Sequence, residues 1–422
     1  MVFDLENSDH EDSDENDDNQ NPNLISSNGT QWTVVTQANV GRAPARNICN
    51  FRQGFKIGLH PQSRKEAFEI FFNNCIETAR IYSNIYGSRK YFAAKKEFKP
   101  ISALEIKAFL GLHILAGSYK ATHRYTEELW SECDGHPIFR ATMSFERFKI
   151  IKSVLRFDDT LRRDRNDPAA PIRSVLDLFN DNIISNYVPS PHITLDEQLI
   201  EFHGRVKFRR YVPTKPGKYG MLLYWMADAV NSIPLKGVLY IGESTLTAVE
   251  KQEGTFSEAI SMKLVRPFLS KGRNVTMDNY FTSLSLEHKL AQNNTTLVGT
   301  LRSNRRECPP VAKCTAGRTK GDTVHYRNNN ATLASFWDKR NKPVVLLSSM
   351  HSGEAYLNEG KCEIIEYYNS FKSGVDNFDK LVRGYRSQRK CCRWPYGIFF
   401  TLVDAACVTA FKLWLEDHTE TH

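Results

Sequence analysis

The sequence predicts an α/β protein in which an all-helical domain precedes a domain built on a mixed β-sheet. Four successive segments between residues 46 and 190 carry apolar residues at helical spacing. From residue 191 onward, short runs rich in β-branched and aromatic residues alternate with helical segments instead. A chain of 422 residues with 41% hydrophobic content can bury a large core, so we expect two or three domains.

The first 45 residues are expected to form a disordered acidic tail and linker. Residues 1–20 contain nine of the 48 acids and no Lys or Arg, and they offer few side chains to bury. The remaining chain therefore has a formal net charge of +17, compared with +8 for the whole chain. Such a basic body favours a polyanionic partner, with binding that weakens steeply as salt rises. Whether the tail is only solvated or competes with that partner for the basic face is left open.

The helical domain is predicted at 46–190, with helices at 63–86, 100–117, 144–157 and 174–188. Ser102 and Glu105 have the spacing of a capping box and mark the start of the second helix. The apolar run 396–415 is predicted to be a buried helix, because Asp404 and Lys412 are costly inside a bilayer. The N-terminus has neither the basic nor the apolar region of a signal peptide, so no membrane association is expected.

The sheet domain is predicted from strands and helices that alternate after residue 191. Strands are expected at 192–202, 218–230, 234–242, 274–281 and 295–302, with helices at 254–269 and 284–293. A helix after Gly374 should complete this domain, which is thereby split into residues 191–303 and 363–384. The intervening segment, 304–362, is too long for a simple connection and is expected to be an inserted β-rich module. Its basic residues are interpreted either as DNA contacts or as a solvated surface: Lys313, Arg318, Lys320, Lys339, Arg340 and Lys342.

Four aspartates in three segments are the candidate catalytic residues. Asp196 lies within the first strand among apolar neighbours, and Asp278 follows the strand that begins at Asn274. Asp376 and Asp379 are three residues apart, which puts both on one face of a helix. If they converge, the carboxylates repel one another unless a divalent cation neutralises them, and oxygen ligands suit Mg²⁺ or Mn²⁺. Two such ions promote phosphodiester cleavage. The alternative is that each aspartate only caps a turn.

Longer motifs around these acids resemble the piggyBac family of DNA transposases and their domesticated derivatives. The resemblance runs from about Phe51 to about Trp414 and rests on DEQLIEFHGRVKFRRYVPTKPGKYG, MDNYFTS, SGVDNFDK and RKCCRWPYG. It implies a ribonuclease-H-like catalytic domain in which Asp196, Asp278 and Asp376 hold two metal ions, with Asp379 as an accompanying acid. It also implies that the helical domain, completed by about 385–422, binds DNA and forms a homodimer.

The activity implied by the resemblance is metal-dependent DNA strand cleavage and strand transfer, that is, cut-and-paste transposition in the nucleus at TTAA targets. The alternative is a domesticated DNA-binding or chromatin protein without transposition activity. Many members end in a Cys/His-rich zinc module, and no such module follows Trp414 in this sequence. We therefore expect modest sequence preference on duplex DNA from the chain itself.

Two basic runs are predicted to bind DNA phosphates. The first follows Asp196 and contains Arg205, Lys207, Arg209, Arg210, Lys215 and Lys218. The second follows the helix with Asp376 and interleaves basic and aromatic residues, as in proteins that bind single or distorted strands. It contains Arg383, Arg386, Arg389, Lys390, Arg393 and Trp394. A solvated basic surface is the alternative for both runs.

The nine cysteines predict a reduced, intracellular protein, because their number is odd and none forms a CxxC pair. A zinc site made by Cys308, Cys314 and Cys362 with His325 or His351 fits no common ligand spacing. We therefore expect buried thiols rather than a structural zinc ion.

Overall fold

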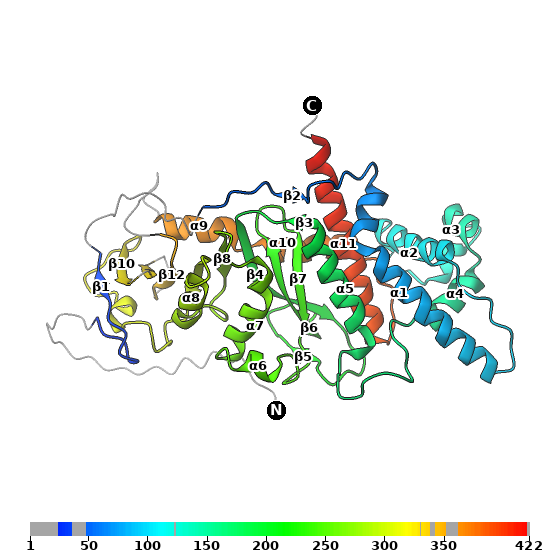
Figure 1. Cartoon of the computed structure of the whole chain (residues 1–422), viewed down its shortest axis with the longest axis horizontal. Coiled ribbons are helices and arrows are strands. Elements are labelled where there is room, and N and C mark those ends of the chain that lie inside the picture. The colour runs from blue at the N-terminus through cyan, green and yellow to red at the C-terminus, as the bar shows by residue number, and fades with distance from the viewer. Residues whose placement is uncertain are drawn as a thin grey trace.

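A ten-stranded mixed sheet forms the centre of the part of the chain that the structure describes (Figure 1). The structure is a computed structural model, and it describes residues 24–35, 48–121, 124–329, 331–337, 342–351 and 362–419. The strands of this sheet are β1 (Thr33–Val34), β4 (His192–Glu201), β5 (Arg210–Tyr211), β6 (Tyr219–Asp228), β7 (Pro234–Leu239), β8 (Asn274–Met277), β9 (Thr296–Leu301), β10 (Thr323–Asn328), β11 (Ala331–Phe336) and β12 (Val344–Ser348). A separate small sheet pairs β2 (Gly54–Phe55) with β3 (Tyr187–Val188).

The strand order is β1-β10-β11-β12-β9-β8-β4-β6-β5, with β7 also paired to β6. The pairs β4–β8 and β8–β9 are parallel, and the other pairs of this sheet are antiparallel. Helices cross between the parallel strands, as parallel connections require: α7 (Phe256–Val265) precedes β8, and α8 (Leu284–Ala291) lies between β8 and β9. The predicted order of strands and helices from residue 191 is confirmed.

The helical domain contains the predicted helices and further short ones. Its helices are α1 (Arg64–Ala93), α2 (Ala103–Ser118), α3 (Pro137–Thr142), α4 (Phe145–Val154) and α5 (Ala170–Asn186), with a 3₁₀ segment at Glu127–Trp130. The predicted capping box is present, because Ser102 Oγ accepts from Glu105 N and Glu105 accepts from Ser102 N. The other helices are α6 (Ala248–Lys251), α9 (Glu363–Phe371), α10 (Gly374–Gly384) and α11 (Trp394–Thr419), with 3₁₀ segments at Arg266–Phe268 and Pro310–Lys313.

Helix α11 joins the helical domain to the sheet domain. In Figure 1 it passes beside α1 and α5, and it contacts both of them as well as α10. Phe399 on α11 packs against Phe72 on α1, with ring centroids 5.6 Å apart, and against Phe157 at 4.5 Å. By length and composition α11 is the one helix in the described ranges that fits a bilayer span, yet it lies mostly buried within the protein.

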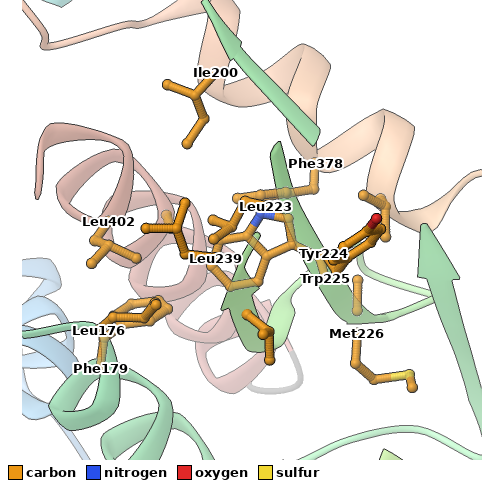
Figure 2. Packing of buried hydrophobic residues seen from close by; sticks show 14 of the residues in the cluster. Leu176, Phe179, Ile200, Leu223, Tyr224, Trp225, Met226, Leu239, Phe378 and Leu402 are labelled. Carbon is orange, nitrogen blue, oxygen red and sulfur yellow. The ribbon is translucent and has the colours of Figure 1, made fainter. Parts of the chain in front are cut away.

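Trp225 on β6 is the centre of the core that holds helices against the sheet (Figure 2). Its side chain is fully buried, and its indole meets Phe179 of α5 and Phe378 of α10 edge to face, at centroid distances of 6.3 and 5.6 Å. Gly237 on β7 lies against the same ring, since a Cβ there would come within 2.6 Å of Trp225. The helix that carries two candidate acids is therefore packed directly on β6.

The structure extends one prediction about domain organisation and corrects another. The inserted segment does form the predicted strands, but β12 pairs with β9, so the insertion extends the central sheet. The tail predicted at 1–45 is also too long. Thr33 and Val34 pair with β10, and buried Trp32 donates its indole N–H to Glu307 O at 3.0 Å. This strand and the buried Trp32 were not predicted, because the acidic, polar composition of the surrounding residues is typical of a disordered tail. The acidic residues 1–20 lie outside the described residues.

Candidate active site

Asp196 and Asp278 are brought together by strand register. Leu195 on β4 pairs with Met277 on β8 in parallel register, and each aspartate is the next residue along the chain. Neighbouring strands in a sheet lie about 4.8 Å apart. The two carboxylates therefore leave adjacent strands at the same level of the sheet, where β8 ends.

Helix α10 approaches this point through a close contact at Gly374. A Cβ at Gly374 would lie 2.5 Å from Thr194 Cγ2 and 3.0 Å from Ala229 Cα, so only glycine permits this approach. Thr194 Oγ1 also donates to Lys372 O at 3.3 Å. Because side chains on a strand alternate between faces, Thr194 and Asp196 lie on the same face of β4. Gly374 at the start of α10 therefore contacts Thr194, which is two residues before Asp196 on β4. Asp376 is two residues after Gly374 on α10.

Asp379 is bound on both sides. Its Oδ1 accepts from Gln198 Nε2 at 2.7 Å, and its Oδ2 pairs with Arg383 Nη2 at 2.8 Å. Asp376 is exposed, whereas the side chain of Asp379 is only 18% exposed. The two acids of α10 therefore differ in setting: Asp376 is open to solvent, and Asp379 ties α10 to β4.

The ionisation of the two strand acids reflects burial and the charges of neighbouring acids. Burial and the adjacent Glu197 raise the pKa of Asp196 well above its ordinary value. Burial and the charge of Asp196 raise the pKa of Asp278 to about 6, although the Tyr280 and Phe281 backbone N–H groups partly oppose the shift. Both carboxyls would be stabilised as anions by a nearby cation.

Other charges at the site indicate that the acids face one region. Burial raises the pKa of Tyr368 on α9, and so do the charges of Asp278, Asp196 and Asp376. Burial alone would lower the pKa of Lys215, but the neighbouring carboxylates raise it overall; these belong to Glu197, Asp196, Asp376 and Asp379. Tyr368 and Lys215 thus sense the charges of acids from β4, from the end of β8 and from α10.

Lys215 is a second cation beside these carboxylates, in addition to Arg383. Its Nζ donates to Glu197 O at 3.2 Å and lies 3.6 Å from Glu197 Oε1. Its side chain is 21% exposed. Lys215 was predicted as a DNA contact from its place in a basic run, and the structure shows that it faces the acids. Sequence reasoning did not single out Glu197, Gln198 or Tyr368. The spacing of Gln198, two residues from Asp196 on one strand face, was a usable signal.

In the described ranges, no three His, Cys, Asp or Glu side chains lie close enough together to hold a metal ion as they stand. The donor chemistry nevertheless fits hard divalent ions, because the acids are all carboxylates and two of them have raised pKa values. In the inserted segment, His325 Nε2 lies 3.1 Å from Cys362 Sγ, whereas Cys314 is exposed.

The first basic run forms a surface loop next to β4. Arg205, Lys207, Arg209 and Lys218 are exposed, and residues 203–207 and 209 line an open surface pocket of about 450 Å³. Arg210 is half-buried, with its guanidinium 5.1 Å from the Tyr240 ring. The exposed members of this run remain available to a polyanion.

The second basic run is largely used inside the protein. Arg389 is only 4% exposed, and its guanidinium donates to Ala121 O and Arg124 O. Arg393 donates to Leu155 O at 2.8 Å and to Lys152 O, at the C-terminal end of α4. These are carbonyls near helix ends, where cationic donors are favoured. The prediction of DNA contacts at Arg389 and Arg393 is therefore replaced by a packing role.

The remaining members of that run differ among themselves. Trp394, which was predicted to contact DNA as part of this run, is half-buried and packs edge to face on Phe208, with ring centroids 5.1 Å apart. Lys390 is exposed. Arg383 and Arg386 line a cavity of about 360 Å³ that also reaches Gln198 and Asp379. Lys339 and Arg340 of the insertion lie outside the described residues.

Comparison with known proteins assigns this fold to one class of protein, the transposases. The sequence model of the family described as Transposase IS4 matches residues 63–411, and the chain belongs to this transposase family. Within it the chain is of the piggyBac type. Its fold matches a cryo-EM structure of the piggyBac transposase synaptic complex with hairpin DNA at a TM-score of 0.82 and 32% identity. The match covers 88% of this chain and 79% of the other, and it confirms the ribonuclease-H-like sheet.

Curated human relatives agree with this assignment. The chain is 24% identical over 349 residues to PiggyBac transposable element-derived protein 3, covering 78% of this chain and 57% of that protein. The chimeric ERCC6-PGBD3 protein has the same identity over the same length, covering 78% of this chain and 32% of that protein. The chain thus spans little more than half of the first relative and about a third of the second.

Proposed function

We propose that this chain cleaves DNA strands and joins the freed ends to target DNA, using divalent metal ions held by Asp196, Asp278 and Asp376. The observation that carries the proposal is the parallel pairing that sets Asp196 beside Asp278, together with the close contact of Gly374 on Thr194 that holds the start of α10 against β4. The matched piggyBac transposase structure is a complex with hairpin DNA, which supports DNA as the substrate.

In this proposal the acids bind metal ions and the basic residues bind DNA phosphates. Asp196, Asp278 and Asp376 would hold two Mg²⁺ or Mn²⁺ ions, which activate the attacking oxygen and stabilise the leaving oxygen when bound. Lys215, which is bonded to Glu197, supplies a positive charge beside them and would face the phosphate being cleaved. Exposed Arg205, Lys207, Arg209 and Lys218 bind the flanking backbone without reading its sequence.

Cut-and-paste transposition at TTAA targets, action as a homodimer and nuclear location are parts of the same proposal, and they rest on the piggyBac relationship. The test is nicking of a DNA duplex by the purified chain with and without Mg²⁺ or Mn²⁺. Metal-dependent nicking supports the proposal, and binding of the same duplex without nicking in either metal contradicts it.

Binding to DNA without cleavage is the second candidate function. It is favoured by Lys215, which already supplies a cation to the acids, and by the first curated relative, which is described as a transposable element-derived protein. The nicking assay separates the two candidates, because both predict DNA binding and only the first predicts broken strands.

A further inference from the structure

Gln198 is a buried amide that connects the sheet core to the active-site helix. Its side chain is 3% exposed and lies on the same face of β4 as Asp196. Its Oε1 accepts from Trp225 Nε1 at 2.9 Å, and its Nε2 donates to Asp379 Oδ1 at 2.7 Å. Trp225 lies directly opposite Asp196 in the β4–β6 register. The two hydrogen bonds of Gln198 therefore connect Trp225, the cross-strand neighbour of Asp196, to α10, the helix that carries Asp376.

The orientation of this amide is fixed by chemistry. An indole N–H can only donate, so the atom of Gln198 that faces Trp225 is the carbonyl oxygen. The amide NH₂ group must then face Asp379, where it meets a carboxylate that can only accept when ionised. A flipped amide would lose both bonds, and buried polar groups without partners are costly. Gln198 thus holds one oxygen of Asp379 in one position.

The other side of Asp379 is held by its own helix. Arg383, one turn further along α10, pairs with Oδ2 at 2.8 Å. Each oxygen of Asp379 therefore has a partner, in contrast to exposed Asp376. The indole of Trp225 is fixed in turn by Phe378 on α10 and by Phe179 on α5, as Figure 2 shows for the rings.

We propose that Gln198 is a positioning residue of the active site: it holds Asp379, and through it the register of α10 on β4, so that Asp376 stays beside Asp196. Asp379 then acts as a support for the metal-binding acids and not as a ligand. The proposal rests on the proposed function for its catalytic meaning, whereas the hydrogen-bond chain itself stands on the distances above.

An exchange of the two partners tests this role in the full chain. Gln198→Glu places a carboxylate against Asp379, and Asp379→Asn offers a single amide oxygen to two donors, Gln198 Nε2 and Arg383, so that one of the two bonds is lost. In the double variant the introduced glutamate accepts from Trp225 and from the introduced asparagine, so the bond is restored with reversed polarity. Losses of supporting residues around metals are typically 10- to 100-fold. We expect each single variant to lose about this much nicking rate and the double variant to recover most of it.

Two readouts do not depend on cleavage. Mn²⁺ stabilisation of the protein against heat gives a half-saturating concentration, which should rise about 10-fold or more in the single variants and return in the double variant. The indole N–H resonance of Trp225, assigned by Trp225→Phe, should shift in Gln198→Leu. Asn180→Asp is the matched control, because Asn180 is also a buried amide, bonded to both backbone groups of Gly237 on β7. It should lower the unfolding temperature without changing Mn²⁺ half-saturation.

The possible results are distinguishable. Recovery of Mn²⁺ half-saturation in the double variant supports the positioning role. A double variant as impaired as Asp379→Asn would show that the Asp379 carboxylate is itself a ligand, and it would overturn the proposal. Unchanged Mn²⁺ half-saturation in both single variants would also overturn it. If the wild-type chain binds Mn²⁺ but nicks no DNA, the proposed function fails, while the Mn²⁺ titrations still decide the role of Gln198.

Discussion

Leu195 on β4 is paired with Met277 on β8, and this single parallel pairing sets Asp196 beside Asp278. Two like charges roughly 5 Å apart repel by about 3 kcal/mol at an effective dielectric constant of about 20. The raised pKa of Asp278 expresses this cost together with burial, whereas burial and the adjacent Glu197 raise the pKa of Asp196. A site that is costly for the protein alone and becomes favourable with a cation is expected of a metal-dependent enzyme.

The first prediction is that Asp196→Asn, Asp278→Asn and Asp376→Asn each lower strand cleavage by more than about 100-fold, beyond the loss typical of a supporting residue. The amide keeps the shape of the side chain and removes the charge that holds the metal. Duplex affinity, measured in Ca²⁺ or EDTA by fluorescence anisotropy, should stay within a few-fold. An Asp278→Asn protein with near-normal nicking would remove Asp278 from the site.

A second prediction concerns pH. The pKa of Asp278 is raised from 3.8 to about 6 in the folded protein, so the folded state keeps a proton that the unfolded state has lost. Its contribution to stability is complete below pH 4 and is lost as pH rises toward 6. In EDTA, the unfolding temperature should therefore fall less between pH 4 and 7 in Asp278→Asn than in the wild type. Equal slopes in the two proteins would contradict the shift.

A third prediction concerns the exposed basic loop. Lys207→Ala, Arg209→Ala and Lys218→Ala should each reduce the slope of log affinity against log salt by about one unit, since each phosphate contact releases about one counterion. The measurement is a salt titration of duplex binding.

The controls for this titration are two further cations. Lys251→Ala changes an exposed lysine on α6 and should leave the slope unchanged. Arg393→Ala should leave the slope unchanged as well but lower the unfolding temperature, because it removes bonds to Leu155 O and Lys152 O. A smaller salt slope in Arg393→Ala would restore that residue to the DNA interface.

A fourth prediction concerns Lys215. Lys215→Met removes the ammonium group from among the acids, so the metal-free protein should unfold at a lower temperature. Mn²⁺ should bind the variant several-fold more tightly, because the resident charge no longer repels the ion. Lys215→Arg is the matched control and should bind Mn²⁺ as weakly as the wild type. Weaker Mn²⁺ binding by Lys215→Met would show that Lys215 supports the ligands.

The order of strands and helices could be predicted from the sequence because alternating patterns and polar turns are local signals. Asp278 could be placed at the end of its strand in the same way, whereas Asp196, expected near a strand end, lies in the middle of β4. The buried hydrogen bonds of Arg389 and Arg393 could not be predicted, because the backbone carbonyls that accept them belong to residues 121–124 and 152–155, far away in the sequence. The attachment of β1 to β10 was missed for the same reason. Contacts that bury a charge or extend a sheet depend on tertiary structure, which residue patterns do not encode locally.

The most direct test of the central claim is a change of metal preference. In Asp278→Cys a thiol replaces one carboxylate, and thiolate ligands favour softer ions such as Mn²⁺ over Mg²⁺. Nicking of a duplex by this variant should be lost in Mg²⁺ and recovered in part in Mn²⁺, whereas Asp278→Asn should stay inactive in both. Nicking by Asp278→Cys at the wild-type rate in Mg²⁺ would contradict the account, because Asp278 would then not bind the catalytic ion.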